Sequence, residues 1–161
     1  MNNKEFRTVR GYQLLAQNKR LLTSAMEDYL EMIYRNSLQE GYIRINKLAD
    51  LLNVKASSAS KMVQKLGELG MLNYEKYGII TLTENGTEIG KYLLERHITI
   101  ENFLRFLGCE TDALIQTELL EHNINANTVE SIKVLNEFFG RHKDVFERFS
   151  LFKKNYIKEE N

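Results

Sequence analysis

The chain has 161 residues, of which 43% are apolar and 27% are charged, so its length suits one domain or two small domains that share a core. Its 22 basic and 22 acidic side chains balance, which excludes a protein that coats nucleic acid by bulk charge. The single cysteine, Cys109, excludes an internal disulfide framework and a multi-thiolate zinc site. No apolar run approaches the roughly 18 residues of a membrane span, and the N-terminus lacks a hydrophobic signal region, so we expect no membrane contact and a cytoplasmic location.

Charge is divided unevenly along the chain. Residues 1–80 carry 12 basic and 8 acidic side chains, whereas residues 81–161 carry 10 and 14. DNA contact is therefore expected in the first half and cation binding in the second. Because proline is absent and Leu, Ile, Glu and Lys recur at helical spacing, we expect a mainly α fold.

The first two expected elements are an extension and a helix. Residues 1–22 are rich in basic side chains and have loosely spaced leucines, which predicts a flexible basic N-terminal extension with at most a frayed helix. Thr23 or Ser24 can cap the next helix, because a short hydroxyl accepts bonds from the free N–H groups of the first turn. That helix is expected to run to about Asn36.

The pattern of residues 42–83 is typical of a winged helix-turn-helix. Asn46 is expected to cap a short helix, and residues 53–56 make a tight connection to a second helix over residues 57–69. Gly70 then ends that second helix.

The wing of this motif is expected to be a β-hairpin. Two β-rich runs over residues 71–75 and 79–83 flank Lys76-Tyr77-Gly78, where the glycine can adopt the positive φ of a tight turn. Residues 23–83 are thus predicted to form a winged helix-turn-helix DNA-binding domain.

The second helix of the motif has a polar and basic outer face without any acidic residue between positions 55 and 65. Three lysines on a helix usually mean only a solvated face, but the order helix, short turn, polar helix and hairpin is typical of DNA-binding domains. Short polar and basic side chains reach phosphates and base edges in the major groove. The predicted DNA-binding residues are Lys55, Ser57, Ser58, Ser60, Lys61, Gln64, Lys65 and Lys76.

From residue 84 onward the helical pattern returns. We expect a long helix from residue 84, a shorter one near residues 112–122 and a final one over about residues 127–152. The final helix carries an apolar stripe that so small a domain can hardly bury alone, which predicts a two-fold homodimer.

Carboxylates and histidines recur at spacings that place them on single helix faces. Asp28 and Glu31 are three residues apart, and Glu118, Glu121 and His122 lie within one helical turn. With His97 they offer oxygen and imidazole ligands without thiolates, a set that suits Mn(II) or Fe(II) better than a closed structural zinc site.

Carboxylates and histidines at such spacings also occur outside metal-dependent regulators. Acidic pairs on helices are common and usually only solvated. His142 lies among Arg141 and Lys143 without a carboxylate at ligand spacing, which indicates a surface residue. The chain lacks the two histidines of a protease zinc motif, whereas a di-iron carboxylate enzyme matches the ligands but leaves the winged helix unexplained.

With both features in view, the sequence resembles the diphtheria toxin repressor family of metal-dependent repressors, in particular its manganese-responsive branch. The resemblance covers about residues 22–155 and is carried by the segments SAMEDYLEMIY, SSASKMVQKL, NYEKY and RHITIENFLRFLG, and by residues 118–122. It implies an all-α metal-binding and dimerisation domain over residues 84–161.

The resemblance also implies a function and a ligand set. The function would be repression of metal-uptake genes through double-stranded operator DNA, with Mn(II) as corepressor, Fe(II) as the alternative and two ions per chain. The implied ligands are Asp28, Glu31, His97, Glu118, Glu121 and His122. In the iron-responsive branch of the family, the resemblance implies methionine at the position of Asp28 and cysteine at that of Glu118. This sequence has oxygen donors at both positions, which favours Mn(II).

Two competing hypotheses belong to other classes of protein. A winged-helix regulator that senses an organic ligand would bind DNA equally well in the presence of chelators. A carboxylate-bridged redox enzyme would show oxygen-dependent turnover and would have no operator.

Overall fold

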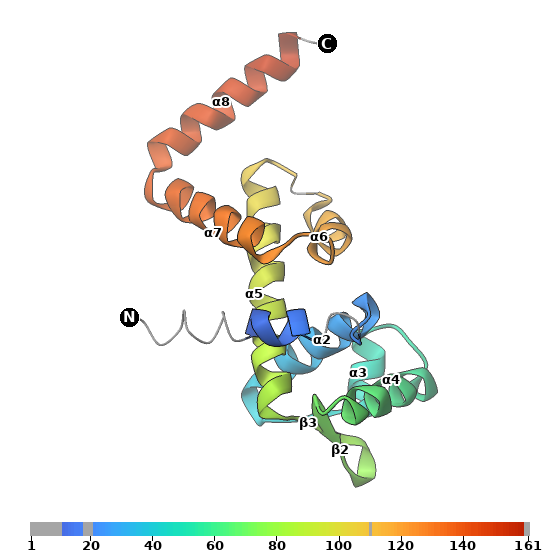
Figure 1. Ribbon diagram of the computed structural model, residues 1–161. Helices are drawn as coiled ribbons and strands as arrows, with labels where there is room; N and C mark the ends of the chain where they lie inside the picture. The colour runs from blue at the N-terminus through green and yellow to red at the C-terminus, as the bar shows by residue number, and fades with distance from the viewer. Residues whose placement is uncertain (1–10, 18–20, 110, 160–161) are drawn as a thin grey trace. The chain divides into compact units, whose positions relative to one another are not determined.

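The computed structural model describes residues 11–17, 21–109 and 111–159, and it divides into two compact units, residues 1–95 and 96–161 (Figure 1). The two units are described separately. Helix α5 (Glu84–Phe106) runs through the boundary, so its first half belongs to one unit and its second half to the other. Among the described residues, no helix is long and apolar enough to cross a membrane.

The first unit contains helix α2 (Ser24–Glu40), which Thr23 caps as predicted by accepting a bond from the Met26 amide. The helix continues four residues beyond the predicted end at Asn36. It ends where Gly41 adopts a left-handed conformation with φ 77°, and the glycine amide bonds to the Ser37 carbonyl. The glycine after the helix, rather than the polar residue within it, sets the end of α2.

The helix-turn-helix consists of α3 (Ile45–Leu51) and α4 (Ala56–Glu68). The predicted cap at Asn46 is wrong, because α3 already begins at Ile45 after an extended Arg44 and has no side-chain cap. The tight connection is confirmed: Asn53 has a positive φ of 52°, and the Val54 amide bonds back to the Ala49 carbonyl.

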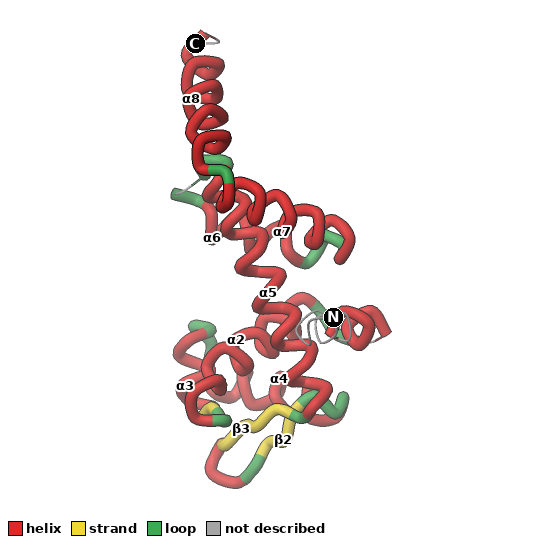
Figure 2. The backbone as a smooth tube through the Cα atoms, turned by 90° about the vertical axis from the view of Figure 1, so that its left-hand side faces the viewer, coloured by secondary structure: helices red, strands yellow, loops and turns green. Residues whose placement is uncertain are grey.

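The wing is confirmed as an antiparallel hairpin of β2 (Leu72–Tyr74) and β3 (Ile79–Leu82), joined by a short 3-10 turn at Lys76–Gly78. Gly78 has the predicted positive φ, 73°, and a Cβ there would lie 2.6 Å from the Ile45 side chain. A short strand that the sequence did not predict, β1 (Ile43–Arg44), pairs with β3 and completes a sheet of order β1-β3-β2. In this unit the hairpin projects beyond the helices (Figure 2).

The core of the first unit is formed by apolar side chains from its helices and its sheet, with Leu30, Val63 and Ile80 fully buried. Helices α2 and α5 cross closely at Gly90, where a Cβ would lie only 2.6 Å from the Tyr34 Cβ. Burial raises the pKa of the Tyr34 phenol, and the carboxylates of Glu95 and Glu88 raise it further.

The prediction of a flexible N-terminal extension is wrong for residues 11–17, which form a helical segment packed on α5 in the first unit. Leu15 is buried in the core, and the Tyr12 and Tyr92 rings are 5.8 Å apart. A Cβ at Gly11 would collide with the Glu88 carbonyl oxygen, so only glycine permits this approach. The prediction for residues 1–10 and 18–20 lies outside the described residues.

The second unit contains the end of α5, α6 (Ala113–Glu121), α7 (Ala126–Arg141) and α8 (Lys143–Glu159). The single final helix predicted over residues 127–152 is wrong, because the chain breaks at His142, with φ −121° and ψ 70°. In both views α8 leaves α7 at this bend (Figures 1 and 2). Ile100, Leu104 and Ala113 form the core between α5 and α6, and the Asn136 amide bonds to the Thr99 carbonyl and ties α7 to α5.

Candidate DNA-reading surface and metal centre

The outer face of α4 carries the predicted polar and basic side chains. Ala59, Val63 and Leu66 are fully buried on the inner face, and this fixes which side chains point outward. Of the residues predicted to contact DNA, those exposed on or just before α4 are Lys55, Ser57, Ser58, Lys61, Gln64 and Lys65. Because helical residues three or four apart share a face, this surface is continuous over three turns of α4.

Two residues of the wing turn also face solvent. Lys76, which the sequence analysis selected, is exposed. Tyr77, which it did not, is 90% exposed and has a positive φ of 65°, unusual for a residue with a side chain. Such a ring at a wing tip could be identified from the sequence only by its position in the turn.

Ser60 differs from the other predicted DNA contacts because its side chain is half-buried. Its hydroxyl lies 3.3 Å from the Tyr74 hydroxyl on β2. This hydrogen bond links α4 to the wing, so Ser60 helps to hold the two elements together.

Two of the predicted ligands lie one turn apart on α2 in the first unit. Glu31 is buried, and one of its carboxylate oxygens accepts a 2.6 Å bond from the Arg35 guanidinium. Asp28 is half-buried. Arg35 was not selected from the sequence, although its i, i+4 spacing from Glu31 is the usual signal for such a pair.

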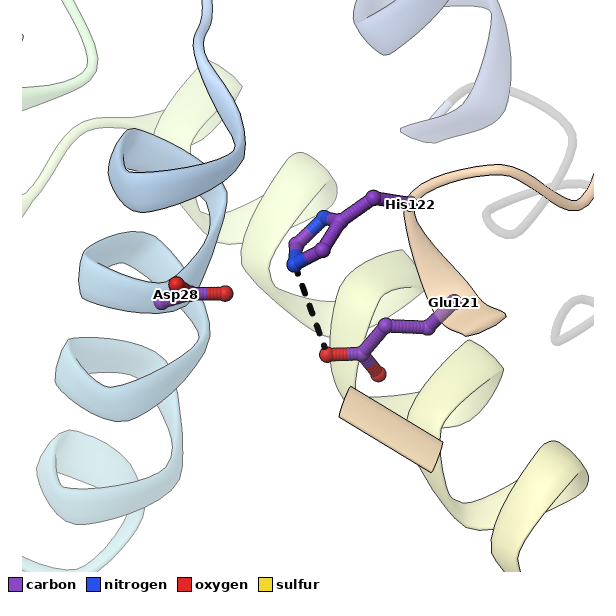
Figure 3. Close-up of side chains that lie close together, drawn as sticks. All are labelled: Asp28, Glu121 and His122. Carbon is purple, nitrogen blue, oxygen red and sulfur yellow. Dashed lines mark ion pairs between the residues drawn. The ribbon is translucent and has the colours of Figure 1, made fainter. Parts of the chain in front are cut away.

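The other four predicted ligands come together within the second unit. His97 on α5 is 3% exposed and Glu121 at the end of α6 is 1% exposed, and their Nδ1 and Oε2 atoms are 3.0 Å apart. The Glu118 Oε1 atom lies 4.0 Å from the same Nδ1, and the His122 Nε2 atom lies 3.8 Å from Glu121 Oε1. Figure 3 shows the Glu121–His122 ion pair as a dashed line, together with Asp28 on α2.

Helix α6 positions three of these four residues. Glu118 and Glu121 are one turn apart on it, and His122 is its C-terminal cap residue. The buried hydroxyl of Thr117 donates a 2.7 Å bond to the Ala113 carbonyl one turn earlier, so this polar group is satisfied within α6.

Two residues beside this cluster were missed from the sequence. Glu101, one turn after His97 on α5, has an oxygen 4.0 Å from His97 Nε2, and the i, i+4 spacing could have revealed it. Arg96 is 4% exposed and one of its terminal nitrogens lies 3.4 Å from His122 Nδ1. Nothing in the spacing indicates Arg96, because neighbouring residues on a helix point in different directions.

His142 lies apart from these clusters, as expected. It is exposed, its ring stacks on that of Phe138 at 4.4 Å, and its Nδ1 atom is 2.9 Å from the Phe138 carbonyl oxygen.

The chemistry of the second-unit cluster fits a divalent cation. A buried carboxylate is unfavourable unless it is paired, and the neighbours of Glu121 are two imidazoles that can themselves be ligands. Carboxylate oxygen and imidazole nitrogen suit Mn, Fe and Zn ions, and the described cluster holds no sulfur ligand. A winged helix joined to such a unit defines a metal-responsive DNA-binding regulator.

Comparisons with known proteins identify the family. Two protein-family models match the chain. The family model described as "Iron dependent repressor, N-terminal DNA binding domain" matches residues 21–80, and the family model described as "Iron dependent repressor, metal binding and dimerisation domain" matches residues 83–146. The HTH-type transcriptional regulator MntR of Listeria welshimeri is 42% identical over 126 residues, which cover 78% of this chain and 89% of that protein. The chain therefore belongs to the iron-dependent repressor family and is a metal-dependent transcriptional repressor, not an enzyme.

Solved structures agree with this assignment. The metal-dependent transcriptional regulator MtsR is 30% identical with a TM-score of 0.63, over 70% of this chain and 54% of that one. The manganese-activated repressor ScaR in its apo form is 29% identical with a TM-score of 0.55, over 67% and 52%. The chain thus spans about half the length of these two proteins. Membership of the family confirms the predicted fold class and contradicts both competing hypotheses, the organic-ligand sensor and the redox enzyme.

Proposed function

We propose that the chain is a manganese-responsive repressor of metal-uptake genes and that six residues hold its metal ions. The observation that carries the proposal is the cluster of His97, Glu118, Glu121 and His122 in the second unit. In that cluster a carboxylate that is 1% exposed lies between two imidazoles. Asp28 and Glu31 on α2 supply the remaining two ligands. Six donor residues, four of them carboxylates, are enough for two ions per chain.

The donor set supports Mn(II) as the physiological ion, with Fe(II) as the alternative. Asp28 and Glu118 offer only oxygen at the two positions where the family resemblance implies sulfur ligands in iron-responsive members, and Mn(II) competes poorly for sites with soft donors. ScaR, which shares the fold, is described as manganese-activated. In the raw affinity order Mn(II) stands low, so selectivity must come from coordination geometry rather than from tightness of binding.

Ligands contributed by both α2 and the second unit explain how metal could control DNA binding. A bound divalent cation supplies positive charge to a set of carboxylates that would otherwise repel one another. Asp28 and Glu31 lie on the first helix of the DNA-binding unit, so fixing them to the second unit limits motion between the units. In a homodimer this favours one separation of the two α4 helices, and DNA that fits this separation shifts the population toward it.

The two domains are proposed to divide at residue 83, with residues 23–83 binding DNA and residues 84–161 binding metal and forming the homodimer. The exposed α4 residues and Lys76 would contact double-stranded operator DNA, whereas Ser60 would act by holding the wing to α4. Lysines bind phosphates, and Ser58 and Gln64 can reach base edges.

The test is DNA binding to the upstream region of the chain's own gene under anaerobic conditions. Fluorescence anisotropy is measured with Mn(II), Fe(II) or Zn(II) and with EDTA, and the metal stoichiometry is measured in the same preparations. We expect binding at low nanomolar to micromolar protein only with metal, strongest with Mn(II), and about two ions per chain. DNA binding of equal strength in EDTA would refute metal control.

A further inference from the structure

Arg96 contacts a proposed ligand within the second unit. It is 4% exposed, stands next to His97 on α5, and one terminal guanidinium nitrogen is 3.4 Å from His122 Nδ1. A guanidinium has N–H donors and no acceptor, and it keeps its proton in proteins. In this contact Nδ1 must therefore be the acceptor, so the ring proton of neutral His122 is on Nε2.

This arrangement uses the lone pair that a metal ion would need. The His122 Nε2 atom faces Glu121 Oε1 at 3.8 Å. If Nδ1 were the ligand atom, Arg96 and the ion would compete for one lone pair. If Nε2 were the ligand atom, its proton would have to move to Nδ1, which could then no longer accept from Arg96. In either case His122 must give up its bond to Arg96 when it ligates an ion.

The charge of Arg96 acts in the same direction. It is a buried positive charge beside a cluster that contains the carboxylates of Glu118 and Glu121. Without metal it offsets part of the repulsion between these carboxylates, and with metal it repels the incoming cation. This repulsion is stronger than in water where the groups are buried, as Arg96 and Glu121 are, and weaker near Glu118, whose side chain is 52% exposed.

We propose that Arg96 is a built-in competitor of the metal ion: it stabilises the metal-free centre and lowers the affinity for Mn(II). This inference rests on the proposed function, because it takes His122 as a ligand. Its consequence is that Arg96 sets the metal concentration at which the repressor responds.

The experiment compares R96M, which keeps an unbranched side chain but loses the charge and the donors, with R96K, which keeps the charge but loses the planar donor group. The matched control is R141M, because Arg141 is an exposed residue of the same unit, paired with Glu137 at 2.8 Å, and its loss changes the net charge equally. Isothermal titration with Mn(II) gives Kd, and thermal unfolding with and without Mn(II) gives the change in Tm.

For R96M we expect a Kd for Mn(II) at least tenfold lower than that of the wild type, a lower Tm without metal and a larger rise in Tm with Mn(II). R96K should show a smaller decrease in Kd, and R141M should stay within twofold of the wild type. A residue with a merely structural role would lower Tm and weaken metal binding together.

A folded R96M that binds Mn(II) no more tightly than the wild type would overturn the role of Arg96. If R96M does not fold, R96K decides, because a Kd equal to or higher than that of the wild type would overturn the proposal. A wild-type protein that fails to bind Mn(II) would instead overturn the proposed function, so the two failures are distinguishable.

Discussion

Removing a single lysine from α4 should change the salt dependence of operator binding by a calculable amount. Lys61 is exposed, follows the buried Ala59 by two residues and lies on the polar face of α4. If it binds a DNA phosphate, Lys61→Ala removes one contact per chain and two per dimer. Each lost contact reduces the slope of log K against log salt by about 0.9, so the slope should fall by about 1.8.

This change in slope predicts an effect on affinity. Between about 50 and about 200 mM salt the wild type should lose roughly tenfold more affinity than Lys61→Ala, because two fewer counterion releases depend on salt. The assay is fluorescence anisotropy of operator DNA at saturating Mn(II) over a series of salt concentrations.

The matched control for this measurement is Lys133→Ala. Lys133 is an exposed lysine on α7, so its removal changes the net charge of the chain equally but leaves α4 intact. Its slope should equal that of the wild type. If Lys61→Ala also kept the wild-type slope and affinity, α4 would not be the element that reads DNA.

Three further predictions concern the metal centre, the dimer and the core. Zn(II) should bind the wild type at least as tightly as Mn(II) but give weaker operator binding at saturation. Asp28→Met should reduce the difference in activation between Zn(II) and Mn(II), and His97→Ala should abolish activation by every metal. The measurement is operator affinity at saturating metal for all three proteins. Equal activation of the wild type by both metals would refute this selectivity. The chain should sediment as a dimer at micromolar concentration with or without metal, and Phe138→Glu should shift it toward monomer, because Phe138 is 43% exposed on the apolar surface of α7; a monomeric wild type would contradict the prediction. Gly90→Val should lower the free energy of unfolding by about 1–3 kcal/mol through overpacking against Tyr34, and an unchanged urea midpoint would show that α2 and α5 do not cross so closely.

Local patterns in the sequence were enough to predict most of the elements. The hydrophobic period of α4 predicts an inner face of Ala59, Met62, Val63, Leu66 and Leu69, with the lysines outside. Ala59, Val63 and Leu66 are fully buried, whereas Met62 and Leu69 are half-buried against the core. Gly78 predicted the wing turn because a tight turn needs a positive φ, a property of a few neighbouring residues. Such features depend on short-range sterics and periodicity, and these are readable without knowledge of distant contacts.

The proposed ligands were also chosen from the sequence, because their spacing places them on single helix faces. Within the second unit, however, only the packing of α6 on α5 shows that His97 and Glu121, 24 positions apart, approach within 3.0 Å. The spacing could select the residues, but it could not specify the distance between two helices.

Other features depended entirely on tertiary contacts. The two residues of β1 are a strand only because they pair with β3, and helix 11–17 is ordered because Gly11 allows a close approach to α5 and Leu15 reaches the core. The break at His142 separates two helices whose apolar faces would have made one continuous pattern. The contact of Arg96 with His122 joins α5 to the end of α6. In each case the deciding interaction is between residues distant in sequence or depends on packing, and a local pattern contains no information on either.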